Sequence, residues 1–440
     1  MSDSLQAEQA EQQAEQVQAI LRAADALIDE AVGFLQGMIR FPTVNPPGDA
    51  YPECAHYIGE HLHQLGNEIE YLDLTQEEIA ELAPYGNGQP RTNVVARLVG
   101  SQHTPVMHFN GHMDVVPVST GWSCDPFGGE LRAGRIYGRG ASDMKGGIAA
   151  QVYAVEAIRR AGLALRGTVE QSSVVDEEST GNRNAGMGLL VERGYISAEH
   201  TTYVVITEPL NVDNICLGHR GAIWGEITTF GRQAHGSTPE RGVNAIEQMA
   251  GFLDEAVQVL KPRLQQRLNR TPVVPATASA ASLSFNVVHG GTNTNSVPDS
   301  CTVEFDRRLV MDETLEDARH EIKELLERRA RSNPDFRYAY LERYATDPIW
   351  VNSETPLVQA FTDALQHVLG RTPGYVCSPG TDDQRFVVRD AGIQQCIVYG
   401  PGEITQTHII DESLAITDLL NSIKVMALAT ARLLGVTAHT

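Results

Sequence analysis

The most informative stretches of this chain are GHMDVVP (residues 111–117) and the glycine-rich GRGASDMKGG (residues 138–147). Residues 106–109, which precede GHMDVVP, predict a buried β-strand that ends at this motif. Residues two apart in a strand point to the same side, so His112 and Asp114 project together from the strand end. An imidazole beside a carboxylate is typical of a metal ligand whose ring is oriented by a neighbouring acid. A pair this short also arises by chance on surface strands, which is the alternative.

Further acidic residues follow two later strand-like stretches. The acidic triplet 176–178 comes directly after residues 168–175, and Glu208 follows residues 201–206. Burying unpaired carboxylates costs several kcal/mol, so acids without a cation must lie in solvent. In an open α/β sheet, however, ligands bind beyond the carboxyl ends of the strands. We therefore expect these acids to converge there on a bound cation.

The motifs resemble those of the M20 family of dinuclear zinc peptidases and deacylases, which includes acetylornithine deacetylase and succinyl-diaminopimelate desuccinylase. The resemblance extends from about Val32 to about Gly435 and keeps the family's order of motifs. It implies a hydrolase that cleaves the amide bond of a small N-acyl amino acid or N-acyl amine. The five matching motifs are His112-Met113-Asp114, the loop 138–147, Asp176-Glu177-Glu178, Thr207-Glu208-Pro209 and Thr407-His408.

The resemblance also implies the ligands of two divalent ions, zinc or alternatively cobalt or manganese, about 3.5 Å apart. Asp143 would bridge both ions, and the peptide bond after it is expected to be cis. Glu177 would act as general base and then acid, and Asp114 would orient His112. His108, on the same strand face as His112, is expected in the core, with a place beside the ligands as the alternative. The remaining ligands are His112 and Glu208 for one ion, and Glu178 and His408 for the other.

Other residues are expected to contact the substrate. Spacing alone favours a capped turn around His235 and an Asx turn around Asn295. The resemblance instead implies that His235 stabilises the oxyanion in the partner subunit's site, and that Asn295 and Arg308 bind substrate. Arg307 is a rival to Arg308 for this contact. Arg385, at the end of an expected loop over 374–385, resembles the arginine that pairs bidentately with a substrate carboxylate. A helix-terminus salt bridge is the alternative for Arg385.

The element pattern predicts an α/β fold. We expect a mostly parallel-sheet catalytic domain with helices on both faces, interrupted by an inserted ferredoxin-like βαββαβ lid and dimerisation domain. The first strand of the lid is expected over residues 216–230. Residues 1–15 are expected to be a frayed helix or a flexible tail before an amphipathic helix over 17–38. The expected bounds are 1–215 and 346–440 for the catalytic domain, and 216–345 for the lid.

The amino-acid composition indicates which classes of binding partner and which cellular compartment to expect. The net charge of −22 argues against nucleic acid and anionic membranes as partners. Six scattered cysteines predict free thiols in a reducing compartment, and no apolar stretch is long enough to span a bilayer, so we expect a cytoplasmic protein. The resemblance implies a homodimer that acts on a small molecule.

The exact reaction is open within the family. Deacetylation of the acetylornithine type is the first expectation, followed by desuccinylation, deformylation, and dipeptidase or carboxypeptidase action. Hydrolytic deamination of an amine-bearing substrate is a more distant alternative. A protein that only binds metal would be a different class, and the intact Glu177 argues against it.

Overall fold

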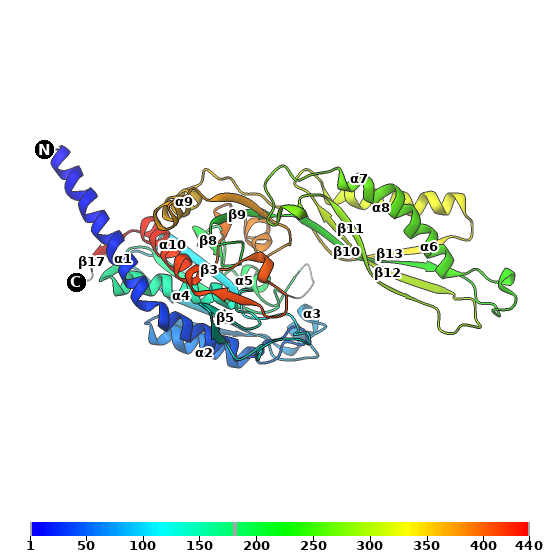
Figure 1. Ribbon diagram of the computed structural model, residues 1–440, viewed down its shortest axis with the longest axis horizontal. Coiled ribbons are helices and arrows are strands. Elements are labelled where there is room, and N and C mark those ends of the chain that lie inside the picture. Colours follow the sequence, from blue (N-terminus) through cyan, green and yellow to red (C-terminus); the bar gives the residue numbers. More distant parts are fainter. Residues whose placement is uncertain (1, 179–182, 439–440) are drawn as a thin grey trace.

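The structure, a computed structural model, describes residues 2–178 and 183–438 of the chain. Figure 1 shows two parts, a catalytic domain and an elongated lid that projects from it. The N-terminal helix α1 (Ser2–Ile39) confirms the helix predicted over 17–38. Residues 2–15, expected as a frayed helix or a flexible tail, continue the same helix, and this end projects beyond the domain (Figure 1).

An eight-stranded sheet forms the centre of the catalytic domain, in the order β1-β2-β7-β3-β8-β15-β9-β14. Strands β7, β3, β8 and β15 run parallel, and β2 and β1 extend the sheet antiparallel. The expected α/β class with a mostly parallel sheet is confirmed. The expected loop over 374–385 was wrong in part, because it contains β14. The strands are β1 (Glu68–Asp73), β2 (Thr92–Leu98), β3 (Val106–His112), β7 (Thr168–Val174), β8 (Tyr203–Ile206), β9 (Asn214–His219), β14 (Gly374–Ser378) and β15 (Cys396–Val398).

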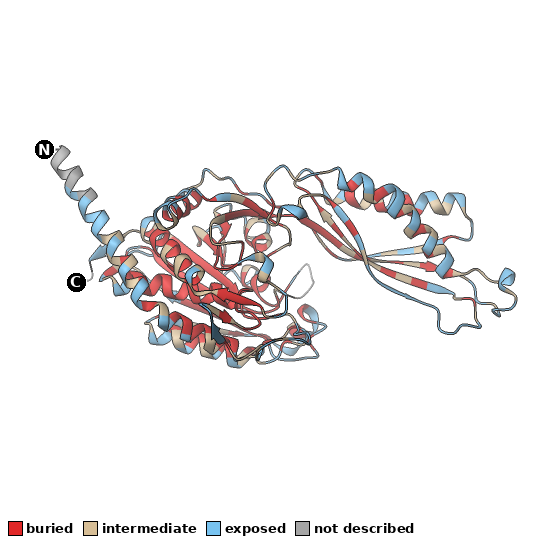
Figure 2. Cartoon of the chain, in the orientation of Figure 1, coloured by how far each residue is buried: buried red, intermediate tan, exposed pale blue. Residues whose placement is uncertain are grey.

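Hydrophobic cores lie on both faces of this sheet, as Figure 2 shows. In β8, Val205 belongs to one core and its neighbours Val204 and Ile206 to the other, because side chains alternate along a strand. Helices α1, α4, α9 and α10 pack into the first core, and α5 with the turn 386–390 into the second. The helices are α2 (Tyr51–Gln64), α3 (Gln76–Leu82), α4 (Lys145–Arg160), α5 (Met187–Glu192), α9 (Pro356–Leu369) and α10 (Ile416–Leu434).

Local sequence sets the ends of these helices, as α9 illustrates. The Thr355 side chain accepts a hydrogen bond from the Val358 N–H, and Pro356 occupies the first turn. Gly370 ends the helix in the left-handed region, with φ of 69°. Two small sheets complete the domain, formed by β4 (Glu130–Arg132), β5 (Arg135–Tyr137) and β16 (Ser413–Ala415), and by β6 (Leu163–Leu165) and β17 (Val436–Ala438).

The lid is a four-stranded antiparallel sheet in the order β11-β12-β10-β13. Helices α6 and α8 pack against it around a separate hydrophobic core. The predicted βαββαβ arrangement is therefore confirmed. Its elements are β10 (Gly221–Phe230), α6 (Ala245–Glu255), α7 (Lys261–Gln265), β11 (Ser282–Gly290), β12 (Ser300–Leu309), α8 (Leu315–Ser332) and β13 (Arg337–Thr346).

The single strand expected over 216–230 was wrong. The structure has two strands there, β9 in the large sheet and β10 in the lid, separated by Arg220. Both strands are apolar, so the hydrophobic pattern does not mark the change of sheet. The Arg220 side chain explains the junction, because it donates hydrogen bonds to the carbonyl groups of Ala278, Ala280 and Leu309 in the lid.

The cysteines and the helices bear on two expectations from composition. All six cysteines are free thiols, as predicted, and five of them are buried. Among the helices of the described ranges, none is long and apolar enough to cross a membrane.

A row of buried polar side chains crosses the centre of the large sheet. Parallel pairing of β3 with β7 sets His108 opposite Glu170 and Asn110 opposite Ser172. The His108 ring lies in the core, with Nδ1 3.3 Å from Glu170 Oε2 and Nε2 2.8 Å from Ser172 Oγ. We call this row the buried polar chain, and its members in order are His200, Glu170, His108, Ser172, Asn110 and Asp383.

The buried Glu170 predicts an acid-sensitive contribution to stability. Burial alone would raise its pKa, but hydrogen bonds from His108 and His200 hold the pKa at about 2, below the usual 4.5. The stabilisation is therefore complete above pH 4.5 and is lost as the pH falls toward 2. We expect Glu170→Gln to lower the free energy of unfolding by about 3 kcal/mol at neutral pH, and by roughly half of that at pH 3. Urea unfolding at both pH values measures the difference.

The control for this prediction is Glu68→Gln, which removes an exposed carboxylate from the edge strand β1 of the same sheet. We expect this variant to unfold like the wild type at both pH values. A Glu170→Gln deficit that is equal at neutral pH and at pH 3 would show that the lost stability comes from packing, and not from the ionised carboxylate.

Candidate metal centre

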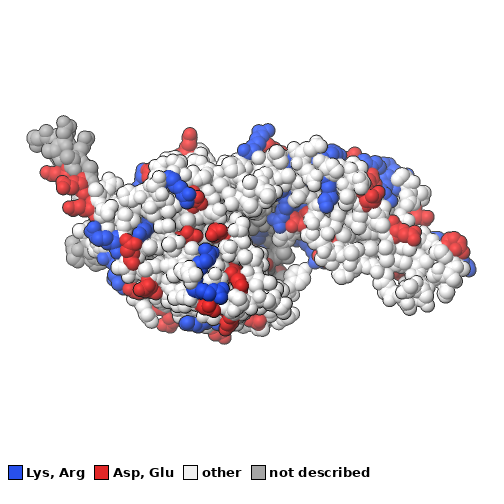
Figure 3. All heavy atoms as spheres, in the orientation of Figure 1, with Lys and Arg blue, Asp and Glu red and all other residues white. Residues whose placement is uncertain are grey.

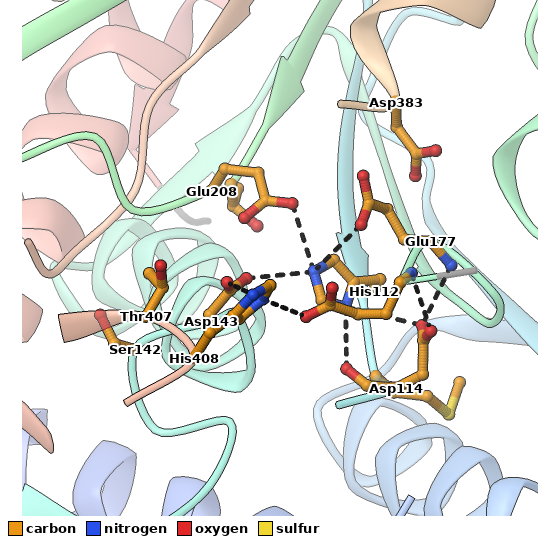
Figure 4. A network of polar contacts seen from close by, with 12 residues as sticks. His112, Asp114, Ser142, Asp143, Glu177, Glu208, Asp383, Thr407 and His408 are labelled. Atoms are coloured by element: carbon orange, nitrogen blue, oxygen red, sulfur yellow. Dashed lines mark hydrogen bonds and ion pairs between the residues drawn. The ribbon is translucent and has the colours of Figure 1, made fainter. Parts of the chain in front are cut away.

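The predicted ligands come from the carboxyl ends of three adjacent parallel strands. His112 is the last residue of β3, Glu178 follows β7, and Glu208 follows β8. Asp143 lies in the glycine-rich loop directly before α4, and its peptide bond to Met144 is cis, as the resemblance implied. His408 arrives from the C-terminal segment. Figure 4 shows the side chains of His112, Asp143, Glu208 and His408 pointing toward a common centre.

Asp143 lies between two imidazole rings. Its Oδ1 is 3.3 Å from His112 Nε2, and its Oδ2 is 3.2 Å from His408 Nε2. Glu208 Oε1 is 3.2 Å from His112 Nε2, and Glu178 Oε1 is 2.9 Å from His408 Nε2. The five residues thus form two half-sites that share one carboxylate, which is the arrangement expected of a bridging ligand.

The chemistry of this donor set fits divalent cations. His112 Nε2 is buried and makes no hydrogen bond within the described residues, although carboxylates surround it. Burial and the charge of Asp143 raise the pKa of Glu208 to about 8 and also raise the pKa of Glu178. Acids that repel one another around an unsatisfied imidazole nitrogen are stabilised by a bound cation. Oxygen and nitrogen ligands accept zinc, cobalt and manganese, so the set does not distinguish these metals.

Glu177 lies beside this centre. Its Oε2 is 4.0 Å from His112 Nε2, farther than the nearest oxygens of Asp143 and Glu208. Burial raises its pKa well above the usual value, and Glu208, Asp383 and Glu178 add to this, against the opposing effect of His112. An acid beside the ligands whose pKa is raised suits proton transfer. Geometry also groups Glu177 with His112 and Glu208 as a possible ligand trio, so metal content must separate the two roles.

Asp114 orients both His112 and the loop that carries Glu177 and Glu178. The Nδ1 of His112 donates to the backbone carbonyl of Asp114 at 2.9 Å, which directs Nε2 toward the centre. The Asp114 carboxylate accepts the backbone N–H groups of Glu178 at 3.0 Å and Glu177 at 3.3 Å. It also accepts from Asn45 Nδ2 at 3.0 Å, a partner that the sequence did not indicate.

Glu412 is a second residue that sequence reasoning missed. It is fully buried, and its Oε1 accepts the backbone N–H groups of Ser142 at 3.0 Å and Asp143 at 3.1 Å. Arg139 pairs with its other oxygen. Burial and the charge of Asp143 raise the pKa of Glu412 to about 7. Glu412 stands in a loop near the C-terminus and belongs to no recognised motif, so only the fold reveals that it holds the loop of the bridging ligand.

We expect Glu412→Gln to weaken metal binding by roughly 10- to 100-fold, as is usual for groups that orient a ligand. The glutamine has one oxygen for three donors, so the loop before α4 loses part of its anchoring. Competition with a chromophoric chelator measures the affinity. The control is Glu403→Gln, which removes an exposed carboxylate from the same segment. Equal affinities in the two variants would contradict this role for Glu412.

The structure separates His235 and Asn295 from the metal centre of the same chain. β10 leads from the junction with the catalytic domain into the lid (Figure 1), and His235 follows the far end of β10. Both residues are exposed. They lie together, because the Gly236 N–H donates to the Asn295 carbonyl at 2.7 Å. The N–H of Ser237 donates to His235 Nδ1 at 3.1 Å, so Nε2 carries the ring proton.

The arginines lie nearer the junction of the two parts. Arg307 is buried and pairs with Glu313, which makes it structural and removes it as a substrate candidate. Arg308 pairs with Asp306 at 2.8 Å. Arg385 contacts the hydroxyl and the ring of Tyr344, from the last lid strand. Basic side chains gather in the hollow between the lid and the catalytic domain in Figure 3.

Arg308 and Arg385 both act electrostatically on the buried His219. Burial, together with the charges of Arg385, Arg389 and Arg308, lowers the pKa of His219 to about 3, against a hydrogen bond to the Arg220 carbonyl. One arginine comes from each domain, so the junction can receive an anionic group from both sides.

The sequence matches peptidase family M20/M25/M40 over residues 108–432. It is 31% identical over 402 residues to a succinyl-diaminopimelate desuccinylase of Methylobacterium radiotolerans, covering 89% of this chain and 93% of that protein. The fold is similar to that of the dipeptidase Dug1p of Saccharomyces cerevisiae, with a TM-score of 0.77, 16% identity, and coverage of 94% and 98%. It is also similar to the Bacillus subtilis YXEP protein, a dinuclear metal-binding M20 peptidase, with a TM-score of 0.64, 18% identity, and coverage of 93% and 99%.

Proposed function

Because the chain belongs to peptidase family M20/M25/M40 and is thus a hydrolase of amide bonds, we propose that it uses two metal ions to remove the acyl group from a small N-acyl amino acid. The observation that carries this proposal is the Asp143 carboxylate, which faces His112 with one oxygen and His408 with the other. A shared carboxylate between two half-sites suits a pair of ions that act on one substrate. Zinc is the metal we propose.

The residues around the centre have separate tasks in this proposal. Divalent ions held there would lower the pKa of a bound water and polarise the substrate carbonyl. Glu177 takes the proton of the attacking water and returns it to the leaving nitrogen. Asp114 keeps His112 in the orientation that directs Nε2 to the centre. Arg385 and Arg308 pair with carboxylate groups of the substrate.

The desuccinylase relatives favour N-succinyl amino acids over the N-acetyl substrates that we first expected. An N-succinyl amino acid carries a carboxylate at each end of the scissile amide. Arg308 of the lid and Arg385 of the catalytic domain both act electrostatically on His219, which agrees with such a substrate. A guanidinium group pairs with a planar carboxylate through two parallel hydrogen bonds, which gives both affinity and orientation.

A second copy of the chain completes the site in our proposal. His235 lies at the remote end of the lid, with its ring proton on Nε2 and available to an oxyanion. The edge strand β11 of the lid is exposed, and Val288 on it is 61% exposed. Unpaired strand edges pair readily with another chain. Light scattering should give a dimer for the wild type and a monomer for Val288→Lys, and a monomeric wild type would refute this assembly.

The deciding experiment is a turnover screen of the zinc-loaded protein. N-succinyl, N-acetyl and N-formyl amino acids, dipeptides and amine-bearing compounds are each assayed with and without a chelator. We expect chelator-sensitive release of the free amino acid, fastest in the N-succinyl series. Faster turnover of dipeptides, or deamination, would replace the proposed reaction. No turnover in any series, with two metals bound, would refute an N-acyl amino acid substrate.

A further inference from the structure

The buried polar chain connects the protein surface with the neighbourhood of Glu177. It begins at the half-exposed His200, whose Nε2 is 2.8 Å from Glu170 Oε1. From His108 it continues to Ser172, whose Oγ is 2.7 Å from Asn110 Oδ1. Asn110 Nδ2 then donates to Asp383 Oδ2 at 3.1 Å. The described mechanism uses none of these residues.

Between His108 and Asp383 the hydrogen bonds of this chain run in one direction. Asn110 donates its amide protons to Asp383, so its Oδ1 must accept the proton of the Ser172 hydroxyl. The Ser172 oxygen then accepts from His108 Nε2. The orientation of the Asn110 amide therefore depends on Ser172.

Asp383 is the end of the chain that faces the active site. It is 1% exposed, and both its oxygens are held, one by Asn110 and the other by Asn184 Nδ2 at 3.4 Å. Figure 4 shows its carboxyl group beside that of Glu177, opposite the metal ligands. A second carboxylate at this place repels Glu177 and restricts where its oxygens can lie.

We propose that Asp383 is a positioning residue for Glu177, and that His108, Ser172 and Asn110 fix the Asp383 carboxylate in the orientation this requires. The inference rests on the proposed function, because Glu177 is there the general base. Asp383 is neither one of the proposed metal ligands nor one of the proposed substrate-binding residues. The inference also gives a role to the polar residues inside an otherwise apolar sheet.

Two neighbouring serines of β7 offer a matched test. Ser172→Ala removes the hydroxyl that joins His108 to Asn110. Ser173→Ala makes the same change one residue on, where the buried hydroxyl has no hydrogen-bond partner in the described part of the chain. For N-succinyl amino acid hydrolysis, we expect Ser172→Ala to lower kcat by roughly 10- to 100-fold. KM and the content of two metals should stay unchanged, and Ser173→Ala should behave as the wild type.

A double variant tests whether Ser172 acts through Asp383. We expect Ser172→Ala combined with Asp383→Asn to be no slower than Asp383→Asn alone, because the second change removes the charge that the first one misplaces. Losses in kcat that multiply would overturn the proposal. So would a loss of metal, or an equal loss of kcat in Ser173→Ala, since either points to general damage to the sheet.

Crystal structures of the two single variants separate this inference from the proposed function. If the wild type hydrolyses no N-acyl substrate, the proposed function fails, but the structures still test the positioning. We expect the Asn110 amide and the Asp383 carboxyl to rotate in Ser172→Ala and to stay in place in Ser173→Ala. Unchanged orientations in Ser172→Ala, with thermal midpoints showing that both variants are folded, would refute the inference.

Discussion

Glu177→Gln is expected to lower kcat by roughly 10²- to 10⁴-fold while both metal ions remain bound. The substitution keeps the size of the side chain and its place beside His112, but the amide cannot accept the proton of water. Glu177 Oε2 is 4.0 Å from His112 Nε2, whereas Glu208 and Asp143 lie closer to the same nitrogen. The metal centre therefore has enough ligands without Glu177. Metal analysis and initial rates on an N-succinyl amino acid measure the two quantities.

The neighbouring variant Glu178→Gln is the matched control. It makes the same chemical change one residue along the same loop, but Glu178 Oε1 is 2.9 Å from His408 Nε2 and belongs to a half-site. We expect this variant to lose metal together with activity. If Glu177→Gln loses as much metal as Glu178→Gln, Glu177 is a ligand and the proton transfer must be assigned to another group.

Removal of the metals by a chelator is expected to abolish turnover and to lower the thermal midpoint. Ions that bind only the folded chain stabilise it by about 4 kcal/mol when their free concentration is a thousandfold above Kd. Burial and Asp143 raise the pKa of Glu208 from 4.5 to about 8 in the metal-free fold. An acid with a raised pKa stabilises the fold at low pH and loses this effect as the pH rises. The metal-free protein should therefore be less stable at pH 8 than at pH 6.

Calorimetry of the loaded and the metal-free protein at both pH values tests this prediction. Re-addition of zinc should restore turnover and the midpoint together. His112→Ala should behave as the metal-free protein even with zinc present, whereas His63→Ala, a change at an exposed position of α2, should behave as the wild type. A chelated protein that keeps full turnover would rule out metal catalysis.

The ligands could be located from sequence because each follows a short local signal. His112 ends a strand, Glu178 and Glu208 follow strands closely, and parallel strands end at the same edge of a sheet. Their convergence therefore required only the element order. The mutual facing of Asp143 and His408 followed from the family resemblance and not from spacing.

The groups that hold the ligands could not be located in this way. Glu412 is 269 residues from Asp143, and Asp383 is 273 residues from Asn110. Such contacts depend on how distant segments pack, and the local sequence around each acid does not indicate its partner. The change of sheet at Arg220 was missed for a related reason, since apolar residues continue on both sides of it. Hydrophobic periodicity indicates strands but not the sheet to which each belongs.

The strand order of the large sheet has a consequence for synthesis of the protein. β15 (Cys396–Val398) lies between β8 and β9, which precede it by more than a hundred residues and the whole lid. Until the ribosome has released β15, the facing edges of β8 and β9 lack their partner, and unpaired edges invite aggregation. The lid is continuous in sequence and can fold earlier. A nascent or truncated chain that lacks β15 can therefore hold a folded lid beside an incomplete large sheet. His408 is synthesised after β15, so this ligand joins the site only once β15 can pair with β8 and β9.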